Sequence, residues 1–105
     1  LPSVKGLKLP AVQYQNRHIF HQYVIRVPER DRLKQFLAEE GIGTDIYYPV
    51  PLHLQECYSF LKYRRGDLPN SEKASEEVLA LPIFPELTED QQKVVVSRIK
   101  AFYKR

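Results

Sequence analysis

Apolar and polar residues alternate most clearly between Phe20 and Val27. The stretch is rich in β-branched and aromatic residues, which favour strands. Tyr23, Ile25 and Val27 fall on one face of an extended chain, because successive side chains of a strand point to opposite sides. Pro28 ends the run. We therefore predict a strand over residues 20–27.

Directly after this strand, the apolar residues recur at the spacing of a helix. Leu33, Phe36 and Leu37 recur at intervals that place them on one side of a helix, which we predict over 31–40. Gly41 follows, where glycine most easily adopts the left-handed conformation that ends a helix. Residues 42–48 are expected to form a short strand before the next prolines. Strand, helix and strand together predict one β-α-β-like unit.

The second half of the chain predicts mainly helix. A short helical turn is expected over 52–60, and a longer helix should begin at Asn70 or Ser71 and run to about residue 79. Residues 81–85 contain two prolines, which cannot donate to a strand ladder, so we expect an edge strand or an extended connector.

The last helix carries its own start signal. Thr88 and Gln91 have the spacing of a capping box, in which each side chain accepts a hydrogen bond from the backbone of the other. The apolar residues Val95, Ile99 and Phe102 continue the helix to about residue 103. The elements together predict an α/β (α+β) fold, a small and mostly antiparallel sheet packed with helices.

Composition narrows the class of protein. The 105 residues suit a single domain, with residues 1–17 as a lead-in and 18–105 as the domain itself. The 16 basic and 13 acidic residues are interspersed, which argues against a nucleic-acid protein. No apolar run is long enough for a membrane helix. Cys57 is the only cysteine, which excludes an internal disulfide and favours a reducing, cytoplasmic location.

Candidate binding residues gather in one Pro-rich stretch. Tyr47 and Tyr48 are adjacent, so on a strand they cannot both enter one core, and the prolines after them pin a loop that presents His53. The three side chains could form the rim of a ligand site. The alternative is a tyrosine that packs flat on a helix beside an exposed histidine.

The other groups of reactive residues and motifs in the sequence do not indicate a catalytic centre. His18 and His21 are three residues apart, and on a strand they lie on opposite faces, which does not suit a shared metal. The chain has no Gly-rich phosphate loop and no nucleophile elbow. We therefore assign no catalytic, cofactor-binding or metal-binding residue within this sequence.

Several segments, taken in order, resemble one protein family. They are His-Gln-Tyr-Val-Ile-Arg at 21–26, Arg-Asp-Arg-Leu at 30–33, Gly-Ile-Gly-Thr at 41–44, Tyr-Pro-Val-Pro-Leu-His at 48–53, Gly-Asp-Leu-Pro-Asn-Ser-Glu at 66–72 and Leu-Ala-Leu-Pro-Ile-Phe-Pro-Glu-Leu-Thr at 79–88. Together they look like the C-terminal portion of the DegT/StrS-type sugar aminotransferases. The likeness departs at Tyr47, where the family usually has histidine.

The resemblance implies the small C-terminal domain of a pyridoxal-phosphate enzyme with the aspartate-aminotransferase (fold type I) architecture. Such a parent would be a homodimer that aminates a keto group of a nucleotide-linked sugar, with glutamate as the donor. The Schiff-base lysine and the cofactor would belong to a missing N-terminal domain, because none of the eight lysines here has a matching context. Tyr47, Tyr48 and His53 would contact the sugar nucleotide. The alternative is a small α/β binding or dimerisation module, with RNA as one possible ligand.

Overall fold

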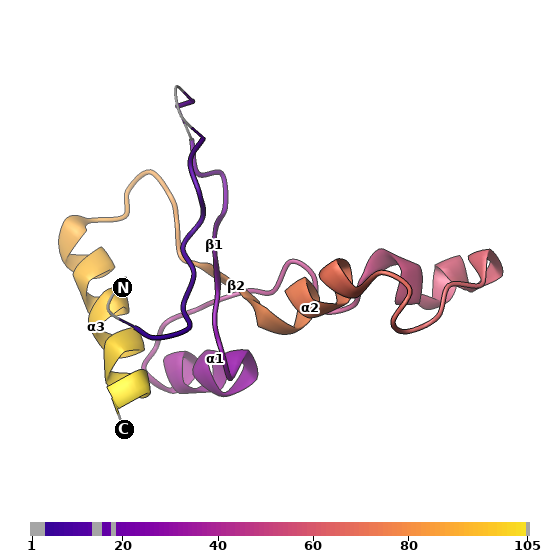
Figure 1. The fold of residues 1–105 in the computed structure, drawn as a ribbon. Coiled ribbons are helices and arrows are strands. Elements are labelled where there is room, and N and C mark those ends of the chain that lie inside the picture. The colour runs from indigo at the N-terminus through magenta and orange to yellow at the C-terminus, as the bar shows by residue number, and fades with distance from the viewer. Residues whose placement is uncertain (1–3, 14–15, 18, 105) are drawn as a thin grey trace.

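A computed structural model describes residues 4–13, 16–17 and 19–104 (Figure 1). The elements follow in the order β1 (Tyr23–Arg26), α1 (Arg30–Glu39), the 3₁₀ turns η1 (Leu52–Leu54) and η2 (Glu56–Leu61), α2 (Pro69–Glu77), β2 (Val78–Leu81) and α3 (Glu89–Lys104). The two strands, α1 and α3 form the body of the molecule (Figure 1). Residues 52–68, which we call the arm, project away from that body together with α2.

The sheet is antiparallel, as predicted. β1 pairs with β2 in a register that places Tyr23 opposite Leu81 and Ile25 opposite Leu79. Single antiparallel bridges extend the sheet at both edges, from Lys8 to β1 and from Asp45 to β2. The predicted small α+β architecture is therefore confirmed, although β1 covers only Tyr23–Arg26 of the strand expected over residues 20–27.

The hydrophobic core lies between the sheet and two helices. Ile25 of β1 and Leu79 of β2 are fully buried against Leu33 of α1 and Ile99 of α3. The periodicity of α1 correctly predicted its buried face, since Leu33 and Leu37 are both inaccessible to solvent. Gly41 follows this helix with a φ of 79°, as expected for a left-handed stop.

The predicted strand over 42–48 is wrong. The segment makes only one isolated bridge, at Asp45. Its backbone groups are engaged elsewhere: Lys34 of α1 donates to the carbonyl of Thr44, and the N–H of Ile46 donates to the carboxylate of Asp45. These hydrogen bonds take backbone groups that a strand ladder would need. The bond to Asp45 is of a kind that short polar side chains commonly make with the nearby backbone.

The boundary between α2 and β2 also differs from the prediction. The helix ends at Glu77, and Val78 and Leu79, which were expected to be helical, begin the strand. The guanidinium of Arg30 accounts for the end of the helix at Glu77. It donates hydrogen bonds to the carbonyls of Ser75 and Val78 at 2.7 and 3.0 Å. Of the residues 81–85, expected to be an edge strand or an extended connector, Leu81 ends β2, residues 82–84 have no regular structure and Pro85 lies in a turn.

The start of α3 confirms the capping box. The N–H of Gln91 donates to the hydroxyl of Thr88 at 3.1 Å, and the N–H of Thr88 donates to the amide oxygen of Gln91 at 3.0 Å. Each side chain thus satisfies a backbone donor that the first helical turn leaves free.

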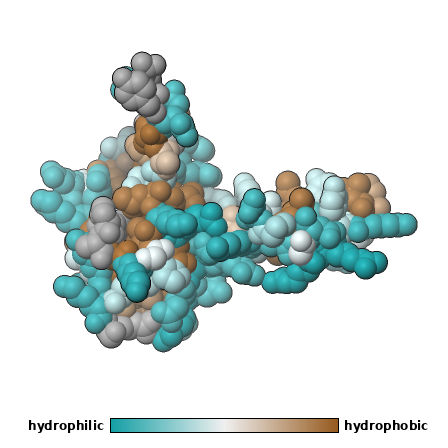
Figure 2. Space-filling model, in the orientation of Figure 1, coloured by the Kyte–Doolittle hydropathy of each residue, from teal (hydrophilic) through white to brown (hydrophobic). Residues whose placement is uncertain are grey.

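The arm carries much of the exposed apolar surface. Leu52 and Phe60 are 66% and 72% exposed, and none of the residues of η2 is buried. Figure 2 shows apolar side chains gathered at the far end of the arm. Within the described part of the chain, none of the helices has both the length and the apolar character needed to cross a membrane.

Replacing Leu33 by alanine tests the assignment of the core. Because Leu33 is fully buried between the sheet and α3, we expect L33A to lower the free energy of unfolding by about 2–5 kcal/mol, measured by urea denaturation. Val94→Ala, on the exposed side of α3, is the matched control and should change it by less than about 0.5 kcal/mol. Equal effects of the two substitutions would contradict this core.

Candidate functional site

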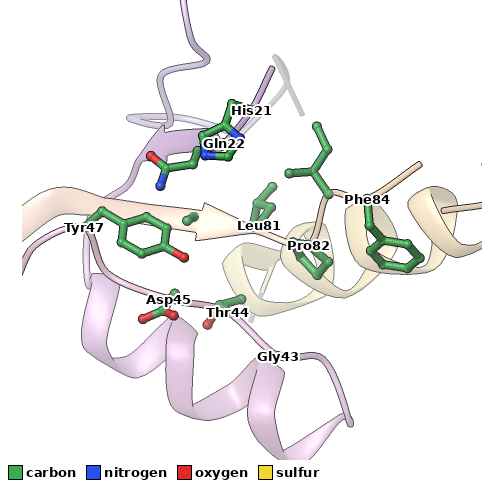
Figure 3. A pocket seen from close by; sticks show the side chains of 11 residues that line it. His21, Gln22, Gly43, Thr44, Asp45, Tyr47, Leu81, Pro82 and Phe84 are labelled. Carbon is green, nitrogen blue, oxygen red and sulfur yellow. The ribbon is translucent and has the colours of Figure 1, made fainter. Parts of the chain in front are cut away.

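A pocket of about 350 Å³ opens on one face of β2 (Figure 3). Three segments enclose it: the lead-in to β1, the stretch between α1 and the arm, and the connection after β2. The lining residues are His21, Gln22, Gly43, Thr44, Asp45, Tyr47, Ala80, Leu81, Pro82, Ile83 and Phe84. Ala80 and Leu81 of β2 thus form an apolar floor between two polar sides.

Tyr47 is the one predicted binding residue that lines this pocket. Its side chain is 38% exposed, and Figure 3 shows the ring lying across β2. Tyr48 is 67% exposed and lies outside the lining, with its ring edge-on to that of Tyr47 at a centroid distance of 5.6 Å. The expectation that at least one tyrosine faces away from the core is confirmed, and it holds for both.

Asp45 and Thr44 are fixed beside Tyr47 by backbone bonds. Asp45 exchanges two hydrogen bonds with Ala80, at 3.1 Å from its own N–H and 2.7 Å from the N–H of Ala80. Oδ1 of its carboxylate accepts from the N–H of Ile46. The hydroxyl of Thr44 is buried and has no hydrogen-bond partner in the described structure. The carboxylate of Asp45 therefore supplies the hydrogen-bonding capacity that a ligand could reach here, because the Thr44 hydroxyl is not accessible.

The pocket contains one formal negative charge. Asp45 supplies it, and none of the lining residues is lysine or arginine. Lys34 is a nearby cation, but its ammonium donates to the backbone carbonyl of Thr44 from the side of α1 and does not line the pocket. The site is thus suited to hydroxyl, amide or cationic groups rather than to anions.

His53 is not part of the pocket rim. It is 7% exposed and lies at the base of the arm, with Nε2 3.2 Å from Oε2 of Glu72. The ring of Tyr63 contacts it edge-on, at a centroid distance of 6.0 Å. The sequence suggested either a ligand contact or an exposed histidine, and the structure shows a buried histidine paired with a carboxylate.

Glu72 joins the two ends of the arm. Its carboxylate accepts hydrogen bonds from the N–H of Gly66 at 2.8 Å and from the N–H of Leu68 at 3.3 Å, in addition to its contact with His53. Gly66 has a φ of 97°, a conformation that favours glycine. The N–H of Gly66 is the main cause that lowers the pKa of Glu72, with His53 and Leu68 adding to it against the opposing effect of burial.

Sequence reasoning missed several of these residues. Asp45 lies two positions before Tyr47, so an extended chain would have placed both on one face. Glu72 gave no periodic signal, because its carboxylate binds backbone groups of a loop that precedes it. His18, weighed with His21 as a metal ligand, lies outside the described residues. Among those described, no group of three or more His, Cys, Asp or Glu side chains is placed to hold a metal ion.

Comparison with known proteins identifies a family. Residues 1–100 match the model of the DegT/DnrJ/EryC1/StrS aminotransferase family. The "Pleiotropic regulatory protein" of Geobacillus stearothermophilus is 56% identical over 87 residues, which cover 83% of this chain and 23% of that protein. The dTDP-3-amino-3,6-dideoxy-alpha-D-galactopyranose transaminase of Aneurinibacillus thermoaerophilus is 35% identical, over 91% of this chain and 26% of that protein.

Solved structures agree with these matches. The crystal structure of DesV from S. venezuelae, in complex with a ketimine intermediate, superposes with a TM-score of 0.93 at 32% identity and covers 98% of this chain and 28% of that one. The structure of ntda from Bacillus subtilis with bound cofactor PMP has a TM-score of 0.81 at 30% identity, over 96% of this chain and 24% of that one. The chain thus spans about a quarter of these relatives.

The lowered pKa of Glu72 makes stability depend on pH. Because the folded state binds this proton less tightly than the unfolded chain, the contribution is complete above the ordinary glutamate value of 4.5 and is lost as the pH falls through the lowered folded pKa. We expect Glu72→Gln to flatten the loss of unfolding free energy on acidification. Urea denaturation from about pH 7 to about pH 3 measures it.

Ser71→Ala, an exposed and uncharged change on the same helix, is the control for this measurement. It should follow the acid dependence of the wild type. A Glu72→Gln variant with the same acid dependence as the wild type would show that the carboxylate does not stabilise the fold through its charge.

Proposed function

Because the chain belongs to the DegT/DnrJ/EryC1/StrS aminotransferase family, we propose that it is part of an aminotransferase that aminates a keto group of a nucleotide-linked sugar with glutamate as donor. The named activity of the Aneurinibacillus relative supports this substrate class. The observation that carries the proposal is the match over residues 1–100, which includes the whole pocket around Tyr47. This aminotransferase proposal takes the place of the alternative that the chain is an RNA-binding module, which the sequence left open.

We propose that this chain forms one wall of the substrate cleft. Residues 18–105 would be the C-terminal small domain and 1–17 its lead-in from an N-terminal domain, in a cytoplasmic homodimer. The pocket supports this role because it combines an apolar floor with polar sides and is open to solvent on its outer face. Closing such a wall over a bound substrate excludes water from the reacting centre.

The candidate residues take different parts in this proposal. Tyr47 lines the pocket, so its phenol is placed to hydrogen-bond a sugar hydroxyl, and the exposed ring of Tyr48 beside it is available to pack on the rest of the ligand. His53 is buried, and we propose that it contributes through Glu72, by holding the arm whose first residues follow these tyrosines.

Pyridoxal phosphate, which the family implies, does not fit the groups of this chain. Its covalent attachment needs a lysine amine, and no lysine lines the pocket, while the ammonium of the nearby Lys34 is hydrogen-bonded to Thr44. We propose that another part of the parent holds the cofactor, which supplies the chemistry of amino-group transfer. The chain alone would then bind and orient substrate without turning it over.

The parent protein tests this proposal directly. The longer polypeptide that contains this chain should show visible cofactor absorbance and should aminate a keto-sugar nucleotide in the presence of glutamate. The 105-residue chain alone should do neither. A parent that binds no pyridoxal phosphate, or a chain that turns over substrate unaided, would contradict the proposal.

Removing one hydroxyl tests the role of Tyr47. In the parent we expect Tyr47→Phe to lower kcat/KM for the keto-sugar by roughly two- to tenfold, since a neutral hydrogen bond contributes about 0.5–1.5 kcal/mol. Tyr58→Phe is the matched control, because Tyr58 lies on the arm outside the pocket. Steady-state kinetics measure both. Equal losses in the two variants would remove Tyr47 from the substrate site.

A further inference from the structure

We infer that the pocket beside Tyr47 receives the neutral, hydroxyl-bearing ring of the sugar, that Asp45 is a specificity-determining residue for that ring, and that the diphosphate is held elsewhere. This inference rests on the proposed function and assigns one part of the substrate to one pocket. It follows from the charge, the free hydrogen-bonding groups and the size of the pocket.

The charge of the pocket favours a neutral group over an anion. The carboxylate of Asp45 is the only formal charge that lysine, arginine, aspartate or glutamate contributes to the lining. The diphosphate of a nucleotide-linked sugar and both carboxylates of glutamate are anions, and contact with Asp45 would bring charges of like sign together in a partly enclosed site. A sugar ring brings hydroxyl groups, which donate hydrogen bonds to a carboxylate.

Asp45 is positioned to accept such a hydrogen bond. Its backbone is fixed to Ala80 by two hydrogen bonds, so the carboxylate has a defined place beside the floor of the pocket. Oδ1 accepts from the N–H of Ile46, and Oδ2 has no hydrogen-bond partner among the described residues. One carboxylate oxygen therefore remains for a ligand, and a hydrogen bond to a charged acceptor is stronger than one to a neutral group.

The other sides of the pocket supply complementary groups. Gln22 and His21 come from the lead-in to β1 and lie across β2 from Asp45 and Thr44 (Figure 3). Within the described residues, the side chains of His21 and Gln22 form no hydrogen bond, whereas the hydroxyl of Thr44 is too deeply buried to reach a ligand. Amide and imidazole groups can each donate to or accept from a sugar hydroxyl.

The floor and the size also suit a single ring. Ala80 and Leu81 present an apolar surface between the polar sides, and a pyranose has apolar C–H faces with hydroxyls around its edge. The volume of about 350 Å³ is near the lower end of the range of roughly 300–1,000 Å³ for small-molecule pockets. It accommodates one ring rather than a complete nucleotide-linked sugar.

Asp45→Asn in the parent holoenzyme tests the assignment, because it keeps the shape of the side chain and removes its charge. We expect the KM for the keto-sugar nucleotide to rise roughly ten- to hundredfold, as for loss of a hydrogen bond to a charged group. The half-reaction with glutamate alone, followed through the cofactor absorbance, should stay within about twofold of the wild type. Asp90→Asn, at the exposed start of α3, should change neither.

A binding measurement gives a readout independent of turnover. By calorimetry, the Kd of uridine and thymidine diphosphate, which lack the sugar, should be the same for the wild type and Asp45→Asn. Tighter binding of these diphosphates to Asp45→Asn would place the diphosphate in the pocket, and a lower KM for glutamate would place the donor there. Either result would overturn the inference.

A second variant distinguishes the loss of a ligand contact from a folding defect. Gln22→Leu lies on the opposite side of the pocket and leaves the charge intact, so it should raise the KM for the keto-sugar without changing the glutamate half-reaction. Thermal melting identifies a variant that fails to fold. If Asp45→Asn and Gln22→Leu fold and both keep the wild-type KM, the inference fails while the proposed function stands. A parent without cofactor absorbance would overturn the proposed function and this inference with it.

Discussion

The position of the pocket depends on two backbone hydrogen bonds between Asp45 and Ala80. They are the only pairing between β2 and the stretch that carries Tyr47, since the rest of that stretch forms no ladder. β2 thereby links the core to the pocket: Leu79 is buried in the core, while Ala80 and Leu81 line the pocket. A core substitution that shifts β2 would move Asp45 with it, so the geometry of the pocket depends on the packing of the core.

The arm is held by polar rather than hydrophobic contacts. No residue of η2 is buried, so burial of apolar surface contributes little to its shape. Its two ends are joined instead by the carboxylate of Glu72, which binds the backbone of the Gly66 turn and the ring of His53. A charged acceptor can order a loop in this way because hydrogen bonds to a carboxylate are stronger than those between neutral groups. The same arrangement makes the arm sensitive to protonation, which apolar packing would not be.

Local signals in the sequence predicted the elements whose causes are local. Leu33 and Leu37 at helical spacing, Gly41 after the helix and the Thr88–Gln91 capping box all depend on residues a few positions apart, and each was confirmed. The predictions that failed concern features set by residues far away in the sequence. The end of α2 is set by Arg30, 45 positions from Ser75, and the place of His53 is set by Glu72, 19 positions away. Tyr47 was a candidate from its proline-rich context, whereas Asp45 and Gln22 became candidates only because the fold brings them to the same pocket.

Large apolar side chains are exposed on the arm and beside the pocket. Phe60 and Leu52 on the arm, and Ile83 and Phe84 beside the pocket, are large apolar side chains in contact with solvent. Exposed apolar side chains that gather in one place, as they do on the arm, usually mark an interaction site, because leaving them in water is unfavourable. The arm has polar contacts at its base and apolar side chains along its length, so it can keep its shape without a partner. An arm that is ordered in advance would lose less conformational entropy on binding a partner than a disordered one.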